Sequence, residues 1–149
     1  MKGAITVANV QQSILINLPV EDVFAFVENP SNLPDVWPSL ERIIDVERQP
    51  NGWYSASYVY RIAGMSFEGH TNLVEYVPNQ RIVTRSKAGV EGTLGWVFQP
   101  EGSGTHLTIE AEYIVPVPLV GMIAEALLVR MHAREAKTLL ANIKAKLEA

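Results

Sequence analysis

Two hydrophobic periodicities follow one another along the chain. Up to residue 115, short apolar or alternating runs are separated by turn signals such as "QPNG", "VPNQ" and "PEGSG". These runs predict seven strands, at residues 3–18, 40–48, 52–63, 65–77, 80–87, 90–99 and 104–115. From residue 119 to 147, apolar residues recur at helical spacing without an internal proline, which predicts one long helix. The apolar stripe of this helix is expected to contain Leu119, Ile123, Leu127, Met131, Leu139, Ile143 and Leu147.

Two short helices are expected between the first strand and the second. Pro19 suits the first turn of a helix over "VEDVFAFVEN", and a second helical turn is expected around residues 33–37. One strand, two short helices, six consecutive antiparallel strands and a long C-terminal helix predict a single α+β domain over residues 1–149. A strongly curved sheet can close over such a helix without filling the space between them, so an internal apolar cavity is expected.

The segment "WYSASYVYRIAGMSFEGHTNL" predicts a hairpin with one aromatic face. If Ala63 and Gly64 form a two-residue turn, Tyr60 faces Phe67 and Tyr58 faces Gly69. Alternation then places on the inner face Tyr54, Tyr58, Tyr60, Ile62, Met65, Phe67 and Leu73. The opposite, solvent-facing set is Ser57, Arg61, Ser66, Glu68, His70 and Asn72.

The later strands divide in the same way, although one register stays open. In strand 104–115 the inward residues are expected to be Leu107, Ile109, Ala111 and Tyr113, with Glu110 and Glu112 outward. In strand 90–99, Leu94, Trp96 and Phe98 share a face. The register between residues 75 and 99 is not determined, because "SKAGVEG" allows two or three loop lengths and a slip of one residue reverses the faces.

Composition and charge exclude several classes of function. The 149 residues include no cysteine, which excludes disulfides, thiol nucleophiles and thiolate metal sites. The net charge of −4 argues against nucleic-acid binding, which needs a basic surface. No apolar run approaches the ~18 residues of a membrane span. A soluble cytoplasmic protein is expected, and transient membrane contact is left open.

Few residues are candidates for chemistry. His70 and His106 are expected to be exposed, and alternation turns the pair Glu110 and Glu112 outward. His132 and Glu135 have the i, i+3 spacing of half a helical metal site, but no second pair accompanies them, so neither a metal nor a cofactor is expected. There is no serine nucleophile motif and no phosphate-binding loop.

Four segments carry a resemblance to a known family. They are "LPVEDVFAFVENPSNLPDVWPSL", "VEYVPNQRIV", "GTHLTIEAEYIVP" and "LLANIKAKLEA", and in this order they resemble the START/SRPBCC superfamily, the helix-grip fold that includes polyketide cyclase/dehydratase-like proteins. The resemblance implies a curved seven-stranded antiparallel sheet around the long C-terminal helix, with a cavity between them. It also implies that the short helices border the cavity entrance.

The tryptophans are interpreted against this expected cavity. Trp37 is either a lid or rim residue or ordinary core against the base of the long helix. Trp96 is expected to face inward, as cavity wall or filled core, whereas Trp53 is expected at a surface or sheet edge.

Three functional hypotheses follow. The preferred one is binding or transport of a hydrophobic small molecule, such as a lipid, an isoprenoid quinone or a polyketide, because it needs only the cavity. The expected ligand-binding residues are Trp37, Tyr58, Tyr60, Met65, Phe67, Trp96, Phe98, Tyr113, Leu127 and Met131. The alternative, a cyclase/dehydratase-type enzyme, needs a positioned acid or base, and the expected inner faces contain none; no catalytic residue is assigned. The third hypothesis is an accessory protein that docks on a larger complex.

Overall fold

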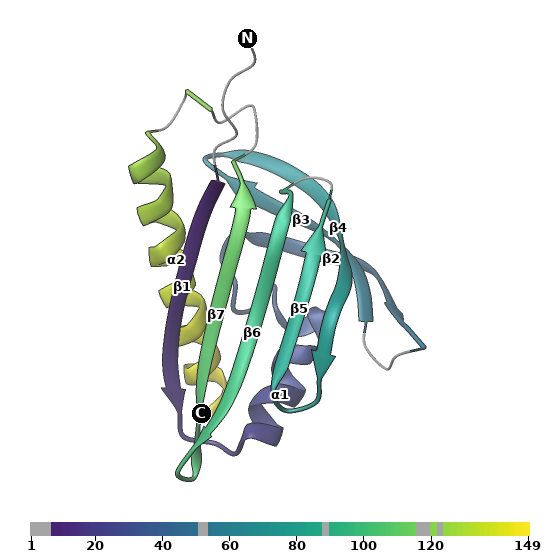
Figure 1. The fold of residues 1–149 in the computed structure, drawn as a ribbon, viewed down its shortest axis with the longest axis vertical. Helices are drawn as coiled ribbons and strands as arrows, with labels where there is room; N and C mark the ends of the chain where they lie inside the picture. Colours follow the sequence, from purple (N-terminus) through teal and green to yellow (C-terminus); the bar gives the residue numbers. More distant parts are fainter. Residues whose placement is uncertain (1–6, 51–53, 88–89, 116–119, 122–123) are drawn as a thin grey trace.

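A seven-stranded antiparallel sheet and one long helix make up most of the molecule (Figure 1). The computed structural model describes residues 7–50, 54–87, 90–115, 120–121 and 124–149. The strands are β1 (Val7–Ile16), β2 (Leu40–Arg48), β3 (Tyr54–Ile62), β4 (Met65–Val77), β5 (Arg81–Ser86), β6 (Gly92–Glu101) and β7 (Gly104–Ile114). The helices are α1 (Val20–Glu28), the 3-10 helix η1 (Pro30–Asn32) and α2 (Glu125–Leu147). The order along the sheet is β1-β7-β6-β5-β4-β3-β2, which confirms the predicted α+β helix-grip architecture.

The hairpin β3–β4 has the predicted register. Ile62 pairs with Met65, Tyr60 with Phe67 and Tyr58 with Gly69. Ala63 and Gly64 have φ angles of 51° and 83°, as a two-residue hairpin turn with both central residues at positive φ requires. The aromatic side chains of β3 therefore point to the same side of the sheet.

The register that the sequence left open is now defined. Strand β5 pairs with β6 from Arg81 opposite Val97 to Ser86 opposite Gly92. This pairing places Ile82 opposite Trp96, and Trp96 lies in turn opposite Ile109 of β7. The central strands thus present a continuous apolar inner face.

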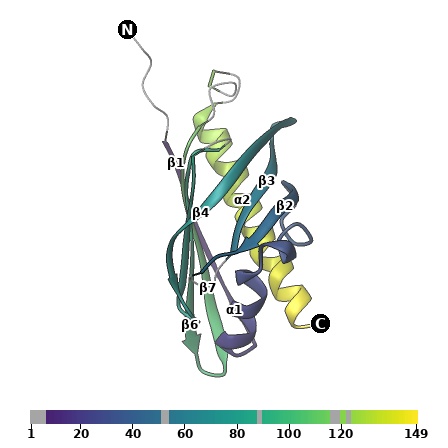
Figure 2. The ribbon, with the colours of Figure 1, turned by 90° about the vertical axis from the view of Figure 1, so that its right-hand side faces the viewer.

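The packed core lies between the sheet, α1 and the C-terminal half of α2. Figure 2 shows α1 and α2 on the same side of the curved sheet. Leu139, Leu140 and Ile143 of α2 are at most 1% exposed, and Phe24 of α1 stacks edge-on against Phe98 with a centroid distance of 5.0 Å. Burial of these side chains contributes hydrophobic stabilisation at this end.

Some element boundaries differ from the sequence expectation. A 3-10 turn at Pro30–Asn32 precedes the expected turn at residues 33–37, where the amides of Val36 and Trp37 donate to Leu33 O over 3.0 and 2.9 Å. Helix α2 begins at Glu125 rather than at residue 119. The expectations for Trp53, Leu119 and Ile123 lie outside the described residues.

Candidate functional site

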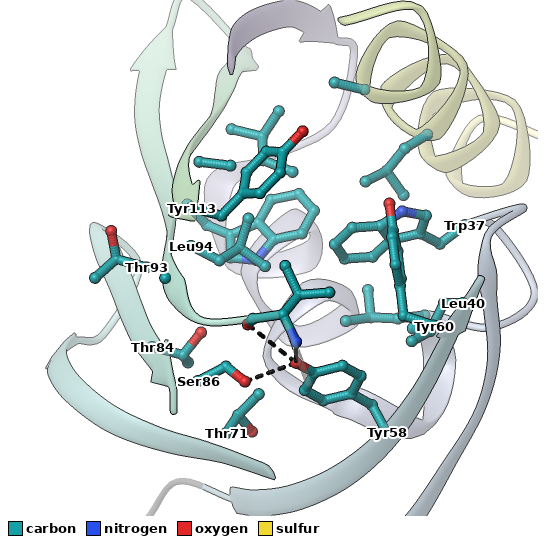
Figure 3. A pocket seen from close by; sticks show the side chains of 18 of the residues that line it. Trp37, Leu40, Tyr58, Tyr60, Thr71, Thr84, Ser86, Thr93, Leu94 and Tyr113 are labelled. Atoms are coloured by element: carbon teal, nitrogen blue, oxygen red, sulfur yellow. Dashed lines mark hydrogen bonds between the residues drawn. The ribbon is translucent and has the colours of Figure 1, made fainter. Parts of the chain in front are cut away.

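A cavity of about 200 Å³ lies between the inner face of the sheet, α2 and the turn that carries Trp37 (Figure 3). Its wall is mostly apolar and draws on segments far apart in the chain. The apolar part includes Val10, Leu40, Ile43, Ile82, Ile109 and Leu139. The predicted internal apolar cavity is therefore present in the structure.

Trp37 lies in the wall of this cavity, half-buried, and is part of an aromatic group. Its ring packs edge-on against the rings of Tyr60 and Trp96, with centroid distances of 5.8 and 6.4 Å. The turn at residues 33–37 sets its position, and Asn142 of α2 donates from Nδ2 to Val36 O over 2.9 Å. Trp96 itself is 3% exposed and also lines the cavity.

One polar group lies on the sheet side of the cavity. The hydroxyl of Tyr58 is 2.6 Å from Ser86 Oγ and donates to Val90 O over 3.3 Å, as the dashed lines of Figure 3 show. Thr84 and Ser86 are buried on β5 and both line the cavity. Sequence reasoning missed these two hydroxyls, although residues 82, 84 and 86 share one face by simple alternation.

A second polar group lies on α2. Tyr60 donates its hydroxyl hydrogen to Glu135 Oε1 over 2.6 Å, and the hydroxyl of Tyr113 is hydrogen-bonded to His132 Nδ1. Glu135 and His132 are half-buried and line the cavity. The expectation that the inner faces contain no acid or base is therefore wrong.

The expected orientation of the N-terminal half of α2 is also wrong. Leu127 and Met131 are 46% and 40% exposed and do not line the cavity, whereas Leu128 is 1% exposed. With 3.6 residues per turn, the positions 128, 132, 135, 136 and 139 share one face. Two of these positions, 132 and 135, are polar. An apolar stripe assigned from the hydrophobic residues alone therefore falls on the neighbouring face, which contains Leu127 and Met131.

Three other expected ligand-binding residues lie beside the cavity wall rather than in it. Phe98 is 2% exposed and packs against Phe24 of α1. Met65 and Phe67 are half-buried and pack against a second apolar cluster. That cluster consists of the buried residues Ala8, Ile62, Tyr113, Val115 and Leu128. Of the expected set, the cavity brings together Trp37, Tyr58, Tyr60, Trp96 and Tyr113.

Burial changes the acid–base behaviour of the polar group on α2. Burial, and secondarily the charge of Glu135, raises the pKa of Tyr60 far above its usual value of 10.0, so its hydroxyl stays protonated and donates to the carboxylate. Burial lowers the pKa of His132 below its usual 6.5, an effect that the nearby Glu135 partly opposes. His132 is therefore an uncharged imidazole at neutral pH. The site offers hydrogen-bond acceptors and a neutral base within an apolar wall.

The remaining candidates lie elsewhere. His70 is half-buried on the outer face and bonds Ser57 Oγ over 3.1 Å, and His106 is half-buried rather than exposed. Within the described part of the chain, no three His, Asp or Glu side chains are grouped closely enough to hold a metal ion. Among the described residues, no helix combines the length and the apolar character that crossing a membrane requires.

Comparison with known proteins finds solved structures with a similar fold. A crystal structure from Thermus thermophilus has a TM-score of 0.80 at 20% identity, covering 93% of this chain and 96% of that chain. A START superfamily protein from Mycobacterium smegmatis has a TM-score of 0.75 at 17% identity, covering 94% and 97%. The Zhui aromatase/cyclase from a Streptomyces species has a TM-score of 0.73 at 14% identity, covering 96% and 94%.

At these identities the structural likeness shows the fold alone. No curated protein matches the chain in sequence. A family model described as polyketide cyclase/dehydrase and lipid transport matches residues 7–148. The chain therefore belongs to the polyketide cyclase/dehydrase and lipid transport family.

Proposed function

We propose that this protein binds a hydrophobic, ring-containing small molecule in the cavity between the sheet and α2. The observation that carries the proposal is the cavity itself, about 200 Å³ in volume and lined mostly by apolar side chains with a few polar groups. Small-molecule sites have this composition. An apolar cavity of about 150 Å³ already admits benzene, so this volume suits a ligand portion of at least one ring.

The aromatic wall supports a ring compound in particular. The ring of Trp37 stands nearly perpendicular to those of Tyr60 and Trp96, with interplanar angles of 82° and 85°. Aromatic side chains favour such edge-to-face and offset contacts with further rings. The family description, which covers both polyketide cyclases and lipid transport, is consistent with a ligand of this kind.

A fluorescence titration with N-phenyl-1-naphthylamine, a neutral two-ring probe that brightens in apolar sites, tests the proposal. Ala136 is 7% exposed and lines the cavity, so Ala136→Phe fills part of the space. We expect saturable binding by the unmodified protein and a roughly tenfold or greater loss of affinity in Ala136→Phe. The matched control is Ala141→Phe, because Ala141 is exposed on the same helix.

Two outcomes contradict the proposal. One is an unmodified protein that shows no saturable binding. The other is an Ala136→Phe variant, shown to be folded by circular dichroism, that binds the probe as tightly as Ala141→Phe does.

The polar group on α2 favours a second candidate, a cyclase/dehydrase-type enzyme. Glu135 and the neutral His132 are bases that line an apolar site, the arrangement in which proton abstraction next to a carbonyl is efficient. The test is mass spectrometry of polyketide-like β-dicarbonyl compounds incubated with the protein. Conversion that stops in Glu135→Gln, with binding of the compound retained, would favour the enzyme; binding without conversion favours the carrier.

A further inference from the structure

The charge of the cavity wall is unbalanced. Glu135 supplies a carboxylate, and among the described residues that line the cavity there is no lysine or arginine. His132 supplies the only ionisable nitrogen among the described lining side chains, and it is uncharged at neutral pH because burial lowers its pKa. No cation among the described lining residues therefore compensates this negative group.

Only one oxygen of this carboxylate accepts a hydrogen bond from the described residues. Tyr60 donates to Oε1 over 2.6 Å, and within the described part of the chain no hydrogen bond reaches Oε2. Hydrogen bonds to an ionised acceptor are about twice as strong as neutral ones. A donor group on the ligand therefore gains a strong partner at this position.

Tyr60 joins this acceptor to the aromatic wall. The ring of Tyr60 contacts Trp37 edge-on at 5.8 Å, while its hydroxyl holds Glu135. A ring compound packed against Trp37 and Trp96 is thereby placed next to the carboxylate. An anionic substituent at that point is repelled, because like charges in a weakly solvated site are poorly screened.

We propose that Glu135 makes the cavity selective for ring compounds that lack a negative charge and present a hydroxyl or another hydrogen-bond donor, and that it rejects compounds with a carboxylate or sulfonate at this end. The proposal rests on the proposed binding function and specifies the class of ligand. It separates phenolic or hydroxylated ring compounds, which fit the site, from free fatty acids, which do not.

The charge part is tested with two probes that share one ring system. N-phenyl-1-naphthylamine is neutral, and 1-anilinonaphthalene-8-sulfonate is the same skeleton with a sulfonate. At neutral pH we expect the neutral probe to bind roughly tenfold tighter or more. In Glu135→Gln the difference shrinks because the sulfonate gains affinity, while glutamine still accepts a hydrogen bond from Tyr60.

Glu112→Gln is the matched control, because Glu112 is exposed on the outer face of β7 and its neutralisation changes the net charge equally. Equal affinities of the two probes in the unmodified protein overturn the proposal. So does an affinity difference that is the same in Glu135→Gln and Glu112→Gln, since a steric clash of the sulfonate would produce that result.

The donor part is tested with 2-naphthol and 2-methoxynaphthalene, which differ in one hydrogen-bond donor. In displacement of N-phenyl-1-naphthylamine, we expect 2-naphthol to bind roughly tenfold tighter or more, the net value of a hydrogen bond to a charged acceptor. The double variant Tyr60→Phe, Glu135→Leu removes the acceptor without stranding the Tyr60 hydroxyl, and the preference should disappear. A preference that persists in the double variant, or is absent from the unmodified protein, overturns the proposal.

Failure of this inference is distinguishable from failure of the proposed function. If the neutral probe does not bind saturably, the binding function itself is refuted. If the neutral probe binds but the ranking among the compounds is absent, the cavity binds ligands and only the role of Glu135 is refuted.

Discussion

The two halves of α2 differ in what they pack against. In the C-terminal half, Leu139, Leu140 and Ile143 are at most 1% exposed. The end of this half is also fixed, since Lys144 Nζ donates to Leu15 O over 2.8 Å and Glu148 Oε2 accepts from the amide of Asn17 over 2.7 Å. This half of the helix has the structure of an ordinary core element.

The N-terminal half of α2 contributes the polar part of the cavity wall on this helix. Its inward positions include His132 and Glu135. Both are hydrogen-bonded to the sheet, His132 to the hydroxyl of Tyr113 and Glu135 to the hydroxyl of Tyr60. Leu127 and Met131 on the same half are largely exposed. One helix therefore serves as a packing element at one end and as a polar cavity wall at the other, and substitutions at the two ends should have different consequences.

The largest expected effect comes from the packed half. Ile143→Ala removes a fully buried side chain outside the cavity wall, so the free energy of unfolding should fall by about 2–5 kcal/mol. Met131→Ala on the exposed face should change it by less than about 0.5 kcal/mol. Urea denaturation monitored by circular dichroism measures both. Equal losses in the two variants would contradict the described difference between the two halves.

A smaller effect on stability but a larger one on binding is expected at Trp37. The ring is half-buried and forms part of the cavity wall, so Trp37→Ala should lower probe affinity roughly tenfold, which is about 1.4 kcal/mol. The accompanying loss of stability should stay below the ~3–5 kcal/mol of a fully buried tryptophan. A loss within that range, with unchanged affinity and off-rate for the probe, would instead assign Trp37 to the core.

Removal of the Tyr58 hydroxyl should have a still smaller effect on stability and on probe affinity. The hydroxyl of Tyr58 is already bonded to Ser86 within the protein, so Tyr58→Phe should cost about 0.5–1.5 kcal/mol of unfolding free energy. Its effect on probe affinity should be slight. Urea denaturation of this variant measures the loss of stability, and probe titration measures the loss of affinity. A large loss of affinity with unchanged stability would show that this hydroxyl binds the ligand.

The smallest expected effect is a pH dependence from His132. Because burial lowers its pKa below 6.5, the unfolded state binds more protons than the folded state as the pH falls through this value. The contribution to stability is complete above 6.5 and is lost as the pH drops toward the folded pKa. The groups that face His132 are Glu135 on α2 and Tyr113 on β7.

Denaturation of the protein and of His132→Gln from about pH 8 down to about pH 5 measures this contribution. The stability of the variant should fall less steeply below 6.5 than that of the unmodified protein. Parallel curves would show that His132 titrates at the same pH in the folded and unfolded states.

Alternation was sufficient where a turn fixed the register. The sequence "AG" at residues 63–64 defined the β3–β4 hairpin, and from it followed the inward positions of Tyr58 and Tyr60. The same rule could not be applied to β5, because the loop before β6 had no unique length. Alternation groups Thr84 and Ser86 with Ile82, but the side of the sheet that this set occupies follows only from the pairing of Ser86 with Gly92.

The helix required information that a hydrophobic pattern does not contain. Polar residues are ordinarily assigned to the solvent face, yet His132 and Glu135 face inward because two tyrosine hydroxyls of the sheet satisfy them. Those hydroxyls belong to β3 and β7, far from α2 in sequence. Hydrogen bonds between residues so distant in sequence can be recognised only once the strands and the helix are positioned in the fold.

Gly92 has a consequence for how related sequences can vary. A Cβ atom at this position would lie 2.6 Å from the Cα of Tyr113, closer than real Cβ contacts come. Any larger residue requires β6 to separate from β7 at the point that holds Tyr113, the partner of His132. In an alignment of relatives, glycine in this column should therefore accompany the tyrosine–histidine pair, and relatives that replace the glycine should also have changed one of those two residues.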